Sequence, residues 1–415
     1  MVVRQYIDSL GQASPGIKRM FLALCLSAGA RGVHMVIFNL YLRDLGYTEA
    51  FVGQTVSLKA LAAVLVLIPA GIVSDKKGRK LVMAGGVLLV GMGLIGVSIV
   101  QASIPLLAFS FAFGLGQSIF MVTNPPFIAE NSGPRERMHL FSLSWSLMMF
   151  STMLGSVFGG WLADYFEILM GLAPVLSKQI TLSLAGVLSI IALLPLAGIR
   201  EKERARKAGD YGFARRLKES PEKKTIGKFV LASLLLGLGA GLIVPYFNLY
   251  FAHVFGLSTG RIGTIMAGGQ AAMALAMLVG PPLAQRTGRV PAICALQGGS
   301  IIFLLILGNT HLLLLALLAF LIRGGLMNSA NPITLNLMME NVSDEMKGTA
   351  TSLHQLVFQL GWTICGPISG LLIASFSYQL VFQVAAIFYT FSTILFYLMF
   401  RGLDRFPEEG GNPSK

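Results

Sequence analysis

Three cationic side chains, Arg31, Lys59 and Arg323, stand deep inside apolar stretches of the sequence. An Arg or Lys at the centre of a membrane helix costs about 2.5 to 3.5 kcal/mol and usually marks a functional site. All 19 acidic residues fall in polar segments or at their edges, so no carboxylate neutralises these charges. The missing counter-charge is then a bound anion. A carboxylate, phosphate or sulfate group accepts paired hydrogen bonds from Arg31, with Lys59 as a point charge.

Contacts within the protein are the alternative interpretation of these three residues. Arg31 and Arg323 can donate to backbone carbonyls or to amides such as Asn331, which lies on the same helical face as Arg323. Lys59 can extend its apolar stem so that its ammonium reaches an interface.

Histidine and amide side chains complete the candidate site. His34 lies one helical turn after Arg31, and His354 lies in a later apolar stretch. Histidine titrates near neutral pH, so either residue can carry a coupled proton; a hydrogen-bonded packing role is the alternative for both. The candidate binding residues are Arg31, His34, Lys59, Asn248, Arg323, His354 and Gln359.

The composition predicts that membrane helices position these side chains. The chain has 415 residues, of which 54% are hydrophobic and 12% charged, and its mean hydropathy is +0.72. Soluble proteins carry about 25% charged residues, and barrel strands show short alternating segments instead of long apolar ones. We therefore expect twelve spanning helices in an all-α integral membrane protein. Their predicted bounds are 18–42, 50–73, 81–101, 105–129, 140–163, 178–199, 229–252, 259–284, 290–308, 312–336, 348–373 and 379–400.

The distribution of basic residues predicts the orientation of the chain. Of the 32 Lys and Arg residues, 26 fall on the side of the termini, three (Arg43, Lys178 and Arg261) on the opposite side and three within the spans. The positive-inside rule then places both termini in the cytoplasm of a cell (inner) membrane protein. This explains the net charge of +13 without nucleic acid as a partner. We expect an N-terminal bundle (1–199), a cytoplasmic linker (200–228) that contacts anionic lipid headgroups, a C-terminal bundle (229–400) and a cytoplasmic tail (401–415).

The two halves of the sequence are related. Phe38-Asn39-Leu40-Tyr41 recurs as Phe247-Asn248-Leu249-Tyr250, and after a one-residue slip several further landmarks recur at a constant spacing. The pattern predicts a parallel duplication of a six-helix unit, with a pseudo-two-fold axis along the membrane normal.

Two charged motifs between the predicted spans carry a family resemblance. The first runs from Gly71 to Lys80 and reads GIVSDKKGRK; Gly71 allows close helix packing, Gly78 a tight turn, and Asp75 and Arg79 can form ion pairs. The second is Glu130 with Arg137, repeated as Glu340 with Lys347; Gln285 replaces Asp75 in the second half. Over nearly its whole length the chain resembles the major facilitator superfamily. The resemblance implies a gate on the cytoplasmic side formed by Gly71, Asp75, Gly78, Arg79, Glu130, Arg137, Glu340 and Lys347.

The resemblance implies a secondary transporter whose two bundles rock about a central site. Members that carry organic anions place an arginine on the first helix and often a basic residue on the second, as Arg31 and Lys59 are placed here; the second arginine that some hold on helix seven is missing. We expect a monomer that moves a small organic anion, coupled to a proton or an exchanged anion and without a metal or cofactor. The alternatives are efflux of amphipathic drugs, flipping of an anionic lipid, or a receptor that does not transport. The sequence has no His-Glu-x-x-His helix, so an enzyme is not expected.

Overall fold

A computed structural model describes residues 11, 13–200 and 220–402 of the chain. Within these residues it confirms the prediction of an all-helical protein with twelve helices long and apolar enough to cross a membrane. Eight of them are single helices: α2 (Pro15–Asp44), α3 (Glu49–Lys77), α4 (Arg79–Ile99), α5 (Ser103–Asn131), α14 (Arg289–Asn309), α15 (Leu313–Glu340), α16 (Asp344–Ser375) and α17 (Tyr378–Phe400).

The other four spans are interrupted, and a proline lies at three of the interruptions (Pro195, Pro245 and Pro281). They consist of α6 (Pro134–Asp164) with the π-turn η1 (Tyr165–Leu169), α7 (Pro174–Ile191) with α8 (Leu193–Ala197), α10 (Lys223–Ile243) with η2 (Val244–Tyr246) and α11 (Phe247–Phe255), and α12 (Thr259–Ala276) with α13 (Gly280–Thr287). Pro245 lies in η2, and Pro281 follows the break before α13. Proline has no N–H and clashes with the preceding turn, so a helix bends or breaks there.

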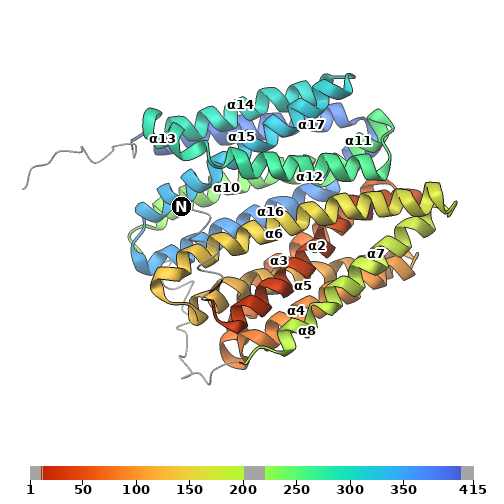
Figure 1. Cartoon of the computed structure of the whole chain (residues 1–415). Helices are drawn as coiled ribbons and strands as arrows, with labels where there is room; N and C mark the ends of the chain where they lie inside the picture. The colour runs from red at the N-terminus through yellow and green to blue at the C-terminus, as the bar shows by residue number, and fades with distance from the viewer. Residues whose placement is uncertain (1–10, 12, 201–219, 403–415) are drawn as a thin grey trace, which may run out of the picture.

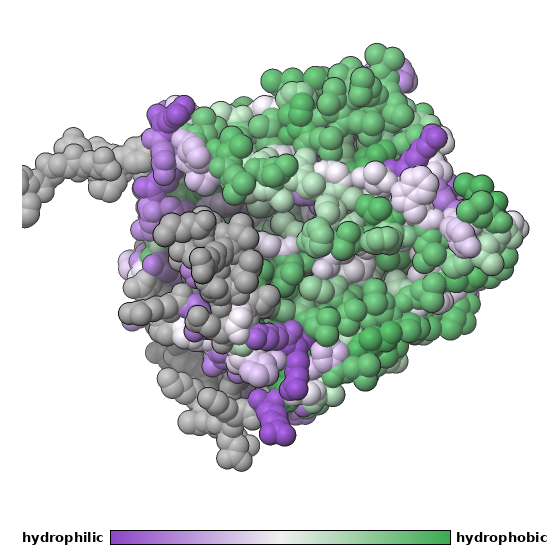
Figure 2. All heavy atoms as spheres, in the orientation of Figure 1, coloured by the Kyte–Doolittle hydropathy of each residue, from purple (hydrophilic) through white to green (hydrophobic). Residues whose placement is uncertain are grey.

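The helices form two bundles, an N half from α2 to α8 and a C half from α10 to α17 (Figure 1). The N half contacts the C half through α3 with α16 and α6 with α12. We call the end of the molecule that holds residues 75–79, 130–137, 285–289 and 340–347 the terminal side, and the opposite end the far side. Apolar side chains cover much of the surface between the two ends, and hydrophilic side chains gather towards the ends (Figure 2).

Each half contains a matching hydrogen bond at the repeated motif. Tyr41 donates from its hydroxyl to the carbonyl of Ser98 at 3.5 Å. At the same spacing in the C half, Tyr250 donates to the carbonyl of Leu307 at 2.5 Å. The repeated motif therefore occupies equivalent places in both bundles.

Small residues bring the two halves into contact on the far side. A Cβ on Gly53 of α3 would meet Gly366 and Pro367 of α16, and a Cβ on Gly263 of α12 would meet Ser156 and Gly160 of α6. These contacts let helix backbones approach closely, as small residues do in membrane proteins.

The C-terminal boundary of the predicted linker differs from the structure. Helix α10 begins at Lys223, inside the predicted linker 200–228, so the helix includes lysines that precede its apolar part. Residues 201–219 of that linker, and all but the first two residues of the predicted tail 401–415, lie outside the described residues.

Candidate functional site

A central chamber of about 330 Å³ lies between the two halves. Helices α2, α3 and α5 supply one wall, and α12, α16 and the residues around η2 supply the other. Five of the seven predicted binding residues line it: Arg31, His34, Lys59, Asn248 and Gln359.

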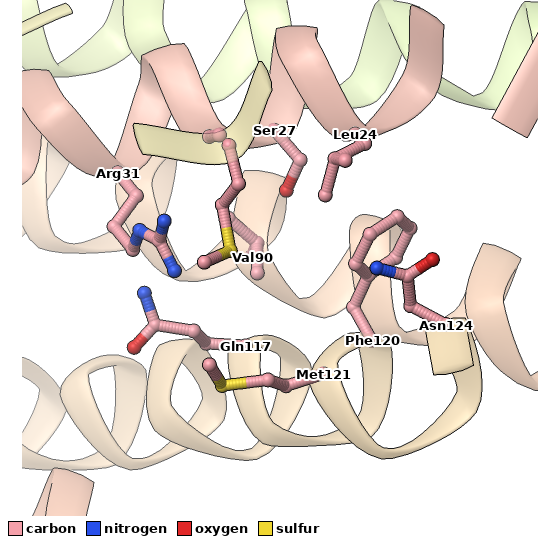
Figure 3. A pocket seen from close by; sticks show the side chains of 10 residues that line it. Leu24, Ser27, Arg31, Val90, Gln117, Phe120, Met121 and Asn124 are labelled. Atoms are coloured by element: carbon pink, nitrogen blue, oxygen red, sulfur yellow. The ribbon is translucent and has the colours of Figure 1, made fainter. Parts of the chain in front are cut away.

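Close packing of α2 on α6 holds Arg31 in place. A Cβ on Gly32 would meet the backbone of Thr152 and Ser156, so only glycine allows this approach. The guanidinium of Arg31 donates to the Thr152 hydroxyl at 2.9 Å. Arg31 also lines a small pocket of about 40 Å³, where it faces Gln117 of α5 (Figure 3). One hydroxyl does not neutralise a guanidinium, so Arg31 keeps its charge and most of its donors for a ligand.

The second cation of the chamber has no acceptor among the described residues. Lys59 Nζ lies 4.7 Å from the ring centroid of Phe38, a cation–π contact. A glycine on the neighbouring helix, Gly114, lets α5 approach the Lys59 backbone closely. His34 is stacked between Phe38 and Phe113, with ring centroids 4.7 and 4.0 Å apart.

Trp362 of α16 adds a further donor to the chamber. Its indole N–H is buried and has no acceptor in the described structure. An indole N–H and an ammonium group both donate hydrogen bonds and cannot accept them. No Asp or Glu is among the residues that line the central chamber. The chamber therefore carries positive charge and unused donors, which is the chemistry of an anion site.

Asn248, which lines the central chamber, also bonds across the two halves. Its amide donates to the carbonyls of Val36 and Met35 at 3.1 and 3.3 Å, and its oxygen accepts from Asn39 at 3.1 Å. Asn39, its counterpart in the repeat, donates to the carbonyl of Pro245 at 2.6 Å. The two asparagines thus tie the halves together by reciprocal bonds, and the polar atoms of Asn248 are engaged.

Arg323 lies away from the chamber, in contrast to the prediction that groups it with Arg31 and Lys59. It is 5% exposed and donates to the Tyr389 hydroxyl at 2.9 Å. Its guanidinium also lies over the ring of Phe247, 5.3 Å from the centroid. The alternative partner considered from the sequence, Asn331, instead donates to Asn328. Arg323 points into the C half, towards Tyr389 and Phe247. The sequence predicts how deep Arg323 lies along its helix, but not which side of the helix faces the central chamber.

A larger cavity of about 1160 Å³ adjoins the central chamber on the terminal side. Helices α6, α10, α12, α14, α15, α16 and α17 line it, and none of its lining residues is Asp, Glu, Lys or Arg. His354 lies in this large cavity, where its Nδ1 is hydrogen-bonded to the hydroxyl of Ser233. The structure thus separates His354 from Arg31 and Lys59.

Bonds across the far side include an acidic residue that the sequence did not single out. Asp164 ends α6, is 6% exposed and accepts from the backbone N–H of Gly260 at 2.9 Å. Gly260 lies in the first turn of α12, whose own Ser258 gives no side-chain cap. A carboxylate stabilises such a helix N-terminus. Trp161 donates to Thr264 of the same helix at 3.0 Å. The signal available in the sequence was only an acid one turn after a pair of glycines.

The predicted charges on the terminal side form one cluster in each half. In the N half, Arg79 is 8% exposed, pairs with Asp75 and with Glu130, the latter at 3.2 Å, and donates to Ser74 at 2.8 Å. In the C half, Arg289 pairs with Glu340. The constant repeat spacing was the signal for Arg289, which occupies the position of Arg79.

The remaining gate residues differ in their surroundings. Arg137 donates to the carbonyl of Ala129 at 2.7 Å, and Lys347 is half-buried in α16. Gly78 has a φ of 98°, as the predicted tight turn requires. The predicted close packing at Gly71 is wrong, because a Cβ there would meet nothing within 4 Å.

Comparison with known proteins matches nearly the whole chain to one family. The model of the Major Facilitator Superfamily matches residues 20–227 and 229–415. Multidrug resistance protein MdtH of Aeromonas hydrophila subsp. hydrophila is 27% identical over 150 residues, which are 35% of this chain and 38% of that protein. Quinolone resistance protein NorA of Staphylococcus aureus is 22% identical over 239 residues, which are 57% of this chain and 59% of that protein. The chain thus matches less than two thirds of each relative's length.

Solved structures share the fold at low sequence identity. One is a bacterial homologue of the human lysosomal transporter Spinster in an inward-facing and occupied conformation, with a TM-score of 0.78 and 15% identity, covering 96% of this chain and 98% of that one. Another is the nucleoside transporter NupG, with a TM-score of 0.76 and 16% identity, covering 93% and 99%. The fold class predicted from the sequence is confirmed.

Proposed function

The chain belongs to the major facilitator superfamily of membrane transporters, and on that premise we propose that it moves a small organic anion bearing a carboxylate or phosphate group. The observation that carries this proposal is that Arg31 and Lys59 line the same central chamber, whose lining residues include no carboxylate. A charge-assisted hydrogen bond contributes about 1.5–3 kcal/mol, so two such groups select an anion over a neutral solute.

Alternating access follows from the arrangement of the two halves. Asn39 with Asn248, and Asp164 with Gly260, join the halves on the far side. The large cavity lies on the terminal side. The distribution of basic residues favours a terminal side that faces the cytoplasm. A conformation that is open on the terminal side and closed on the far side is then the inward-facing state. Rocking of the N half (1–199) against the C half (229–400) closes the terminal side and breaks the far-side bonds.

The terminal clusters supply the groups that join when the terminal side closes. The side chains of Asp75 and Glu130 keep Arg79 within the N half in this state. In the C half, Glu340 likewise pairs with Arg289 and keeps it within that half. In the outward-facing state we expect these carboxylates and cations, together with Arg137 and Lys347, to exchange partners across the halves.

Coupling falls to groups other than a membrane carboxylate. His34 contacts the central chamber and His354 the large cavity, so either can bind a proton as the cavity opens. Exchange of one anion for another needs no proton at all.

A thermal-shift screen tests the proposal with purified protein and a panel of organic anions, cations and neutral solutes. A ligand that binds the folded protein raises its stability by about 2.7 kcal/mol at a hundred times its dissociation constant. We expect anions alone to stabilise the wild type and the Arg31→Ala variant to lose the response. Stabilisation by cations or sugars that survives Arg31→Ala contradicts the proposal.

Efflux of amphipathic drugs is the second candidate. It is favoured by the large cavity, which is lined by aromatic residues such as Trp145 and Phe358, and by the names of the relatives. Cationic drugs have no carboxylate to pair with among the lining residues of either cavity. Stabilisation by cationic drugs in the same screen selects this candidate.

A further inference from the structure

Building on the proposed function, we infer that the cargo is a single-chain amphiphile whose anionic headgroup lies at Arg31 and Lys59 in the central chamber and whose apolar chain lies in the adjoining large cavity. The positive charges line the central chamber, and the lining of the large cavity is mainly apolar, so the two cavities match the two ends of such a molecule.

The division follows the two halves of the protein. Both cations of the central chamber come from the N half, on α2 and α3. The large cavity is lined mainly by the C half and holds no Asp, Glu, Lys or Arg. Its aromatic side chains include Phe229, Phe358 and Phe396. An anion is therefore bound on one side, and a hydrocarbon chain on the other.

The two cavities are neighbours, because residues that line one contact residues that line the other. Gln270 of the large cavity contacts the sulfur of Met35 in the central chamber at 3.7 Å. On α16, Phe358 lines the large cavity and Trp362 the central chamber, with ring centroids 6.3 Å apart. The step from headgroup to chain therefore lies between α2, α12 and α16.

The sizes of the cavities favour an amphiphile over a compact anion. The central chamber of about 330 Å³ lies at the lower end of the range of about 300–1,000 Å³ that small-molecule sites usually measure, which is room for a headgroup or a compact anion. A compact anion leaves the 1160 Å³ of the large cavity unused. Each methylene buried there strengthens binding about fourfold.

The three tryptophans of the chain provide the test, because each reports on a different place. Trp362 lines the central chamber, Trp145 lines the large cavity, and Trp161 lies on the far side against Thr264. Three single-tryptophan proteins, made by replacing the other two with Phe, are titrated in detergent with brominated hexadecanoate. The bromine is placed either next to the carboxylate or at the methyl end, and bromine quenches the indole it contacts.

We expect bromine next to the carboxylate to quench Trp362 and bromine at the methyl end to quench Trp145. Unlabelled hexadecanoate reverses both signals. The single-tryptophan protein that keeps Trp161 is the background control, because its quenching reports probe that is dissolved in the detergent micelle. Lys59→Gln weakens both specific signals at least tenfold, because the ammonium loses its charge.

A chain-length series tests the large cavity independently of tryptophan. Affinities are measured for carboxylates from butanoate to tetradecanoate in the wild type and in Ala271→Phe, which fills part of the large cavity. We expect this variant to weaken tetradecanoate about tenfold and leave butanoate unchanged. Leu275→Phe is the matched control, since Leu275 lies on the same helix, is 68% exposed and is not among the lining residues.

Equal quenching of Trp145 and Trp362 by both probes, or affinity independent of chain length, overturns the inference. If short anions then still require Arg31 and Lys59, the proposed anion transport stands without it. If no anion of any length depends on these two residues, the proposed function fails as well.

Discussion

Asn39→Ala should shift the protein towards the state that is open on the far side. The amide of Asn39 donates to the carbonyl of Pro245 at 2.6 Å and to the oxygen of Asn248 at 3.1 Å, and both bonds cross between the halves. A buried hydrogen bond contributes about 0.5–1.5 kcal/mol net, so the far-side-closed state loses about 1–3 kcal/mol. Every 1.4 kcal/mol changes the ratio of two states about tenfold.

The second asparagine turns this prediction into a double-mutant cycle. Asn248→Ala removes the reciprocal bond to the carbonyl of Val36 at 3.1 Å and the bond shared with Asn39. Since one bond is common to both variants, we expect the effects to be non-additive by about 0.5–1.5 kcal/mol.

Spin labels on the far side measure the shift. Labels at Ala102 and Leu312, exposed residues beside far-side loops of the two halves, are introduced after replacement of the three native cysteines, and their distance distribution is recorded. Asn309→Ala is the matched control, because the bonds of Asn309 within the described residues are to Leu305 and Gln379 of its own half. The reasoning is refuted if both asparagine variants give the control's distances, or if their effects simply add.

Three further predictions concern the gates and the buried arginine. Asp75→Asn removes one of two carboxylates around the gate arginine, whereas Gln285→Ala at the repeat position removes no charge; transport into proteoliposomes should fall much further in the first, and equal rates contradict this asymmetry. Asp164→Ala should lower thermal stability by about 0.5–2 kcal/mol and increase far-side opening, because α12 loses its acceptor; a variant that matches the wild type in both measurements excludes the cap. Tyr389→Phe should destabilise the protein by about 1–3 kcal/mol without changing anion affinity, and a weakened affinity returns Arg323 to the binding site.

The helices and their repetition were predictable because the membrane leaves few choices. Within a bilayer each backbone N–H and C=O must be satisfied inside its own segment, so a long apolar stretch becomes a helix. The motif from Gly71 to Lys80 was equally readable, since Asp75 and Arg79 are four residues apart on either side of the Gly78 turn and pair locally. The pair of Arg289 with Glu340 occupies the repeat positions of Arg79 and Glu130, although Arg289 is not among the gate residues predicted from the sequence.

The direction in which a side chain points was not predictable in the same way. Depth along a helix is fixed by residue number, but the neighbour it meets depends on how the helices are rotated and packed. Arg31 and Arg323 both lie deep, yet one lines the central chamber and the other packs against Tyr389. Asp164 lies at the end of its helix, and only the contact of α6 with α12 makes it a cap.

The central claim is that Arg31 and Lys59 bind an anion. Its most direct test is equilibrium binding of the most strongly stabilising anion of the screen to the wild type, to Arg31→Gln and to Lys59→Gln. Each charge-assisted bond contributes about 1.5–3 kcal/mol, so we expect each variant to bind about 10 to 150 times more weakly while remaining folded. Affinities within twofold of the wild type in both variants would contradict the account.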